Sequence, residues 1–261
     1  MHGPSVDPTK IAALLLDHMS GADCLSFLKA ASKSGVITAA EEKTQEETIT
    51  HGDHSVRVAA SWRVGIGGKT WSTGALACKH LAAHADRYAA LAPKRQLRVL
   101  ELGAGTGVAG LFAAKCLEAR VVLTDAEDHL ELLRDNVRRN NLGESVSVQL
   151  FDWKDETSWD LTSEPDLILC TDNAYHPSLY EPLAAALERC LAGGAKGLFG
   201  VTKTDTSFAF FELLTARGLD YRFAEAPADD YYALLAICKA PAFDGRRDGC
   251  CDGCQGVVDR F

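Results

Sequence analysis

A glycine-rich loop, Gly103-Ala104-Gly105-Thr106-Gly107, lies between an apolar stretch at 97–102 and a stretch with helical spacing at 107–118. Glycines let the backbone turn tightly and approach a ligand closely, because they lack a Cβ. A helix that begins directly after such a loop presents its N-terminal N–H groups to the ligand. The run from Gly105 to Gly110 also fits the dinucleotide-binding pattern. The loop therefore predicts a site for a nucleotide-like molecule.

Asp125 follows the next predicted strand, at 121–124. A carboxylate in this place can accept hydrogen bonds from both hydroxyls of a ribose. Such charge-assisted bonds contribute roughly 1.5–3 kcal/mol each. Asp125 therefore strengthens the prediction of a nucleotide site, which the glycines alone support only weakly.

Glu101 and Gly103 distinguish between two cofactors that such a loop can bind. A nicotinamide dinucleotide carries a negatively charged pyrophosphate, which a carboxylate at the end of the strand disfavours. S-adenosylmethionine carries an ammonium and a sulfonium, which a carboxylate favours, and its own carboxylate can face backbone N–H groups. We therefore expect the loop to bind S-adenosylmethionine, with S-adenosylhomocysteine as the product.

Asp152 and Trp153 come directly after a third predicted strand, at 146–150. An adenine site needs an acceptor for the exocyclic amine and an apolar plate for the ring. Stacking on an aromatic plate contributes on the order of 1–3 kcal/mol per base. The pair predicts an adenine site, and a surface turn with a tryptophan that covers the core is the alternative.

Asp172 and Tyr175 follow a strand predicted at 167–170, at the end where open α/β sheets bind their ligands. Methyltransferases that act on planar nitrogens carry a Pro-Pro pair in this element, and this chain has none there. A carboxylate and a phenol suit an aliphatic amine better. Trp71, upstream of the first core strand, is by default a core tryptophan.

The elements that must position these residues alternate along the chain. Further strands are predicted at 197–201 and 231–238, with helices between the strands at 107–118, 128–141, 177–192 and 207–217. Such alternation predicts a parallel sheet with helices on both faces. We therefore expect an α/β, Rossmann-like sheet, and a weak alternation at 54–60 suggests one more strand before it.

The composition restricts the partners. The chain has 261 residues, a formal net charge of -9 and a pI of about 5.4. This balance provides no global basic face for nucleic acid, and no apolar run approaches the length of a membrane span. Nine cysteines without a secretory signal indicate a reducing compartment. We expect a monomer in the cytoplasm, or also in the nucleus, with no nucleic-acid or membrane partner.

Both ends differ from the predicted catalytic domain at 51–240. Residues 1–50 are expected to form an extension with two short helices within 7–35 and an acidic linker at 39–50. Residues 241–261 read as a flexible tail that catalysis does not need. Cys251 and Cys254 form a Cys-x-x-Cys pair there, but a structural zinc site needs four ligands and the tail holds no second pair. We therefore expect no metal.

These features together resemble the seven-β-strand protein-lysine methyltransferases of family 16. The resemblance runs from about Ile49 to Cys238 and includes the helix after Trp71, the block 99–107, Asp125, the motif from Asp135-Asn136 to Asn140-Asn141, Asp152-Trp153 and Asp172-x-x-Tyr175. It implies that Asp172 and Tyr175 line the entrance for a substrate lysine. It also implies a set of residues that contact the cofactor: Trp71, Glu101, Gly103, Ala104, Gly105, Gly107, Asp125, Asp152 and Trp153.

The chain departs from the family at one place. Asn173-Ala174 stands inside the Asp-x-x-Tyr element, where members usually carry aliphatic residues, and this difference concerns the lysine channel. The run 67–71 resembles members that modify a translation elongation factor, while other members act on chaperones. Three alternatives stay open: a methyltransferase for a small molecule or another protein side chain, a nicotinamide-dependent oxidoreductase, and a protein that binds the cofactor without catalysis.

Overall fold

The computed structural model describes residues 44–61, 64–160, 164–224 and 231–240. The two helices predicted within 7–35 and the tail predicted at 241–261 lie outside the described residues. No helix in the described part of the chain is long and apolar enough to cross a membrane. The same residues contain no group of three or more His, Cys, Asp or Glu side chains arranged to hold a metal ion.

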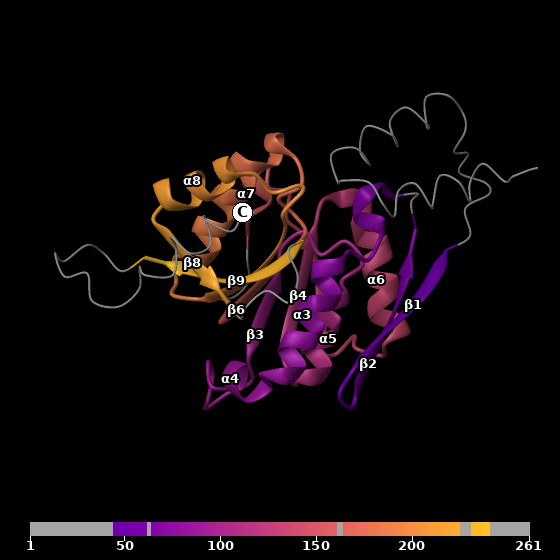
Figure 1. Ribbon diagram of the computed structural model, residues 1–261. Helices are drawn as coiled ribbons and strands as arrows, with labels where there is room; N and C mark the ends of the chain where they lie inside the picture. Colours follow the sequence, from indigo (N-terminus) through magenta and orange to yellow (C-terminus); the bar gives the residue numbers. More distant parts are fainter. Residues whose placement is uncertain (1–43, 62–63, 161–163, 225–230, 241–261) are drawn as a thin grey trace, which may run out of the picture.

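A seven-stranded sheet forms the centre of the fold (Figure 1), and the alternation of strands and helices predicts its parallel part but not the antiparallel strands at one edge. Its five parallel strands are followed by two that make an antiparallel pair at one edge. The order across the sheet is β5 (Val146–Leu150), β4 (Arg120–Asp125), β3 (Arg98–Glu101), β6 (Leu167–Thr171), β7 (Lys196–Thr202), β9 (Tyr232–Lys239) and β8 (Leu219–Phe223).

Helices cover both faces of this sheet. One face carries α3 (Ser72–Ala83), α4 (Ala85–Ala89), α5 (Val108–Cys116) and α6 (Leu130–Arg139), and the other carries α7 (Pro177–Leu191) and α8 (Phe208–Ala216). Successive strand residues alternate between the two cores, because side chains along a strand point to opposite faces. Val99 and Leu169, for example, pack in the first core, and Leu100 and Ile168 in the second.

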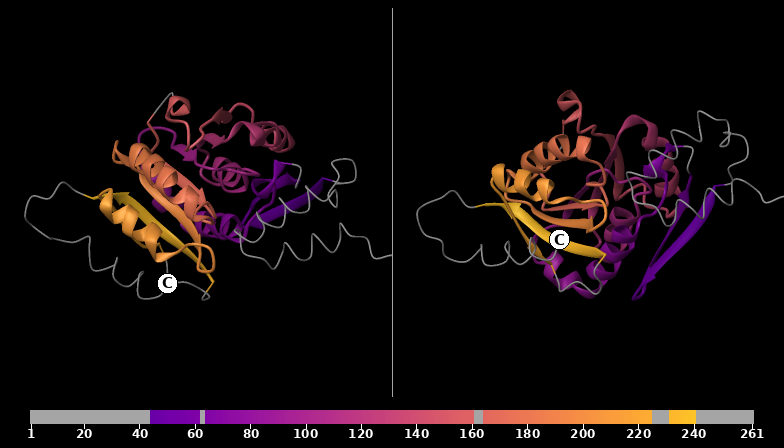
Figure 2. Two further views of the ribbon diagram at one scale, coloured as in Figure 1. Left: turned by 90° about the horizontal axis from the view of Figure 1, so that it is seen from above. Right: turned by 45° about the horizontal axis from the view of Figure 1, so that its top comes forward.

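A separate antiparallel hairpin, β1 (Gln45–His51) and β2 (His54–Ala60), packs against α5 and α6. Figure 2 shows it apart from the central sheet, in indigo. β2 agrees with the weak alternation at 54–60. The end of the predicted acidic linker, in contrast, forms β1. Polar residues suit this strand, because most of its side chains remain exposed or half-buried.

The connection from β5 to β6 takes the chain from one half of the sheet to the other. The order of the strands changes between β3 and β6, which lie side by side although β4 and β5 come between them in sequence. Ligands of open α/β sheets bind at such a switch point, outside the carboxyl ends of the strands. The loops that follow the five parallel strands all leave the sheet at these carboxyl ends. The predicted site residues are therefore brought together by topology.

Candidate active site

A cavity of about 450 Å³ opens at the carboxyl ends of the parallel strands. Eight of the residues predicted from the sequence line it: Trp71, Gly103, Ala104, Gly105, Asp125, Trp153, Asp172 and Tyr175. The other three predicted residues, Glu101, Gly107 and Asp152, do not appear in its wall. The cavity has a glycine-loop end and an opposite end formed by the segments after β6 and β7 and at the start of β9.

The glycine loop leaves no room for side chains at two of its positions. Gly103 and Gly105 have φ angles of 57° and 56°, in the left-handed region that glycine favours. A Cβ on Gly103 would lie 2.5 Å from the Trp153 ring and 2.6 Å from Oδ1 of Asn173, and a Cβ on Gly105 would lie 2.5 Å from the carbonyl oxygen of Gly67. The loop is thus packed between the indole of Trp153 and the segment before α3.

Asp125 holds the loop from the neighbouring strand. Its Oδ2 accepts a hydrogen bond from the N–H of Gly105 at 2.8 Å, and its Oδ1 accepts one from the N–H of Ala126 at 2.8 Å. Nδ1 of His129 lies 3.4 Å from Oδ1. Burial raises the pKa of Asp125, while His129 and the two N–H groups act in the opposite direction. The carboxylate is therefore fixed at the cavity wall with lone pairs left for a ligand.

Glu101 lies beneath the loop instead of in the cavity wall. Its side chain is 1% exposed, and its Oε2 accepts a hydrogen bond at 2.8 Å from the N–H of Gly110, in the first turn of α5. Burial raises the pKa of Glu101 to about 8, although this hydrogen bond lowers it. In the structure this carboxyl connects the end of β3 to α5. Its contact with the cofactor stays a prediction.

Glu101→Gln is expected to change how stability depends on pH. A Glu carboxyl in the unfolded chain has a pKa of about 4.3, whereas the folded value is about 8. Between these values the unfolded state releases the proton and the folded state keeps it, so the wild type loses stability as the pH rises. Gln has no such proton. The difference in Tm, variant minus wild type, should therefore increase by on the order of 5 °C between about pH 5 and about pH 8.

Calorimetric or fluorescence melting curves across this pH range measure that difference. The comparison with the wild type removes the contributions of Asp125 and Asp172, which both proteins share. A difference that stays constant with pH would mean that Glu101 titrates alike in the folded and the unfolded chain.

The adjacent residues Trp153 and Asp152 differ in their relation to the cavity, because only Trp153 lines it. Trp153 lines the cavity beside Gly103, and its buried Nε1 donates to no atom of the described residues. Oδ1 of Asp152 instead accepts from the N–H of Lys154 at 2.9 Å, and its carbonyl oxygen accepts from Nε1 of Trp159 at 2.7 Å. The ring of Trp153 thus forms a flat part of the cavity wall, and its N–H can donate to a ligand. Asp152 instead stabilises the turn after β5.

Asp172 joins three elements at the other end of the cavity. Its φ of 55° is left-handed, a conformation that Asp tolerates better than most residues. Its Oδ2 accepts from the N–H of Thr73 in the first turn of α3 at 2.9 Å, and its Oδ1 accepts from Oγ1 of Thr202 on β7 at 2.7 Å. Burial raises the pKa of Asp172, and the charge of Asp205 raises it further.

Three tyrosines and a second carboxylate, Asp205, line the same cavity as Asp172. Burial raises the pKa of Tyr175 to about 12, so its phenol keeps its proton at neutral pH. Sequence reasoning missed several residues of this end: Leu179, Thr202, Thr204, Asp205, Tyr231 and Tyr232. For Thr202, Thr204 and Asp205 the available signal was positional, because they lie at or directly after the carboxyl end of β7. Sequence reasoning also missed His129, Lys69 and Thr70 at the other end.

Comparisons with known proteins identify the family of the chain. A family model described as lysine methyltransferase matches residues 50–217. The chain is 31% identical over 149 residues to the protein N-lysine methyltransferase METTL21A of Danio rerio, covering 56% of this chain and 65% of that protein. It is 30% identical over 145 residues to the protein-lysine N-methyltransferase EFM2 of Saccharomyces cerevisiae, covering 49% of this chain and 35% of that protein.

The matched region thus spans less than two thirds of either relative. Among solved structures, the METTL16 methyltransferase domain superposes with a TM-score of 0.50 at 15% identity, covering 66% of this chain and 71% of that one. This likeness concerns the fold.

Proposed function

Because the chain belongs to the lysine methyltransferase family, we propose that it transfers a methyl group from S-adenosylmethionine to a lysine side chain of a protein. One observation carries the proposal. The wall of a single cavity holds a glycine loop with a ribose-type carboxylate, after β3 and at the end of β4, and carboxylates with tyrosines in the segments after β6 and β7 and at the start of β9. A nucleotide-like methyl donor and an amine can therefore meet inside it.

The glycine-loop end fits the cofactor on two counts. The glycines at 103 and 105 let the loop turn with left-handed φ angles and pack against Trp153 and Gly67, so that its backbone lies at the cavity wall. The buried Nε1 of Trp153 offers a hydrogen bond that an acceptor on the ligand can take. Asp125 would bind the ribose hydroxyls, and the Trp153 ring would cover the adenine. When bound, S-adenosylmethionine supplies a methyl carbon activated by its positive sulfonium.

The opposite end fits a lysine. A free lysine has a pKa of about 10.4, so its neutral form costs roughly 4 kcal/mol near pH 7.4. Asp172 and Asp205 would attract and orient the ammonium, and the raised pKa of Asp172 makes it a better proton acceptor. The un-ionised phenol of Tyr175 would wall the channel and exclude water. Most of the rate gain would come from holding the amine in line with the methyl group.

Substrate and location are part of the proposal. The resemblance of residues 67–71 to members that act on an elongation factor, and the chaperone substrates of other members, make these two protein classes the first to test. The free thiols of Cys78, Cys116, Cys170 and Cys190 support a reducing compartment such as the cytoplasm. We further propose that the enzyme is a monomer that does not act on nucleic acid.

Transfer of a labelled methyl group in a cell extract tests this function. The purified protein and labelled S-adenosylmethionine are added, and the modified residue is located by mass spectrometry of the labelled band. We expect label on lysine in one or a few protein bands. Label confined to small molecules or nucleic acid, or found on arginine or histidine, would refute the lysine assignment. Calorimetry with S-adenosylmethionine and with NAD separately tests the cofactor.

A further inference from the structure

Two asparagines of α6 bind the backbone of β2. Oδ1 of Asn136 accepts a hydrogen bond from the N–H of Ala59 at 2.7 Å, and its Nδ2 donates to the carbonyl oxygen of Ala59 at 3.1 Å. Asn140 binds Arg57 in the same way, at 3.0 and 2.6 Å. The two amides therefore bind the edge of β2 that β1 does not occupy, as a neighbouring strand would.

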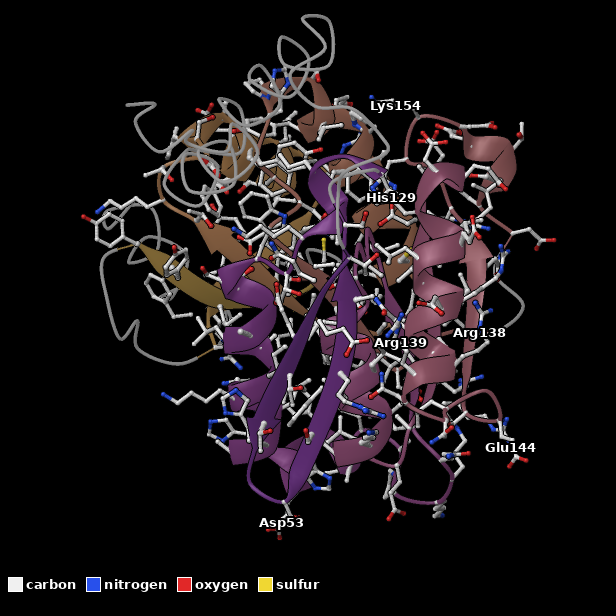
Figure 3. The ribbon with its side chains drawn as sticks, turned by 90° about the vertical axis from the view of Figure 1, so that its right-hand side faces the viewer. Asp53, His129, Arg138, Arg139, Glu144 and Lys154 are labelled. Carbon is white, nitrogen blue, oxygen red and sulfur yellow. The ribbon has the colours of Figure 1, made fainter. Side chains whose placement is uncertain are left out.

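The spacing of the two elements makes this pairing possible. Four residues advance about 6 Å along a helix, and two residues advance about 6.7 Å along a strand. Asn136 and Asn140 can thus reach alternate residues of β2. Figure 3 shows the hairpin, with Asp53 at its turn, beside α6, which carries the labelled Arg138 and Arg139.

The asparagines differ in their remaining hydrogen bonds, and Oδ1 of Asn140 also accepts one from Nζ of Lys115 at 3.3 Å. The second N–H of Asn136 donates to the carbonyl oxygen of Thr106 at 2.9 Å, whereas that of Asn140 donates to the carbonyl oxygen of Asn136 at 2.8 Å. The Thr106 carbonyl shares a peptide unit with the N–H of Gly107, which donates to the carbonyl oxygen of Ala104 at 2.7 Å. Asn136, which is 0% exposed, thus binds β2 and the turn of the glycine loop at once.

A second contact connects the hairpin to the loop. Directly after β2, the N–H of Ser61 donates to the carbonyl oxygen of Gly68 at 2.7 Å. The neighbouring Gly67 lies at the cavity wall, and its carbonyl oxygen closes the space beside Gly105. A shift of the hairpin therefore reaches the loop from two sides, although no residue of β1 or β2 lines the cavity.

We propose that Asn136 is a positioning residue that couples the β1–β2 hairpin to the glycine loop, so that the placement of the hairpin sets the affinity for the cofactor. The inference rests on the cofactor site of the proposed function and extends it to an element outside the cavity. By linkage, cofactor binding must stabilise the contact between the hairpin and Asn136 as much as that contact strengthens binding.

Asn136→Ala and Asn140→Ala form a matched pair, because each removes two hydrogen bonds to β2 but only the first releases Thr106. We expect both variants to have a lowered Tm. Only Asn136→Ala should bind S-adenosylhomocysteine more weakly by at least about tenfold in calorimetry, with Asn140→Ala within about twofold of the wild type. Equal losses in the two variants, or none in Asn136→Ala, would overturn the proposal.

Amide hydrogen exchange of the wild type keeps the proposal testable if Asn136→Ala does not fold. Adding S-adenosylhomocysteine should slow exchange at the N–H of Ala59 clearly more than at the N–H of Arg57. Equal effects would contradict the coupling.

A wild type that binds no S-adenosylhomocysteine would instead refute the proposed function. The coupling is then measured in the free protein. There the N–H of Gly107 should exchange faster in Asn136→Ala than in Asn140→Ala. Equal rates would overturn it.

Discussion

Asp125→Ala is expected to weaken the binding of S-adenosylmethionine by about 2–4 kcal/mol, or roughly thirtyfold to several hundredfold. The variant loses the carboxylate that would accept hydrogen bonds from the ribose hydroxyls. In the wild type the N–H groups of Gly105 and Ala126 each lie 2.8 Å from an oxygen of this carboxylate. The variant leaves both N–H groups without that acceptor. Both effects act on the same loop, so isothermal calorimetry should show a large rise in Kd.

Glu127→Ala is the matched control, because it removes an acidic side chain two residues away that is exposed and does not line the cavity. Its Kd should stay close to that of the wild type. A circular dichroism spectrum and melting curve establish that Asp125→Ala keeps its fold. An unchanged Kd in folded Asp125→Ala would show that this carboxylate only shapes the turn after β4.

Asp172→Asn is expected to reduce methyl transfer to protein by about 10- to 100-fold, as the loss of a charge-assisted contact to the amine implies. The Kd for S-adenosylmethionine should change much less, because the carboxylate acts on the acceptor. Asn is preferred to Ala because Asp172 also binds the N–H of Thr73 and the hydroxyl of Thr202. In the variant the amide oxygen can accept from the N–H of Thr73 and the amide NH2 can donate to Oγ1 of Thr202, so α3 and β7 stay connected.

Asp205→Asn separates the two carboxylates at this end of the cavity. It removes one charge without touching the bonds between α3, β6 and β7, and it should raise KM for the protein substrate without a rise in the Kd of the cofactor.

The competing view is that Asp172 binds the ammonium of the cofactor itself. In that case methyl transfer and cofactor affinity fall together in Asp172→Asn, and the assignment of Asp172 to the lysine is wrong.

The sequence predicts the fold and family well because both depend on local patterns. Strands alternating with helices specify the parallel sheet, and the family prediction is confirmed by the match at 50–217. Gly103, Gly105 and Asp125 follow the ends of adjacent strands, so topology alone brings them to one cavity. The short strand β8 was not predicted, although its five residues, Leu-Asp-Tyr-Arg-Phe, alternate between apolar and polar.

The roles of individual carboxylates were harder to predict, because they depend on where each side chain points. Glu101 ends β3 as predicted, yet its oxygen binds the N–H of Gly110 below the loop. Asp172 reaches its predicted place, but both of its oxygens also bind neighbouring elements. Asp205 belongs to no sequence motif. It can be recognised as a site residue only because the structure places the segment after β7 beside β6. The sequence thus predicts that these carboxylates lie at the carboxyl ends of the strands. The direction in which each side chain points depends on the packing of the folded structure.

The position of β9 between β7 and β8 also governs how the protein can fold during synthesis. β8 precedes β9 in the chain, yet its only partner in the described sheet is β9. A nascent chain that has left the ribosome only as far as Phe223 therefore carries β8 without a neighbour and an open edge on β7. Such edges invite pairing with other chains. The sheet can close only when Tyr232–Lys239 emerges, so the fold cannot be completed before the last strand has been translated and has left the ribosome.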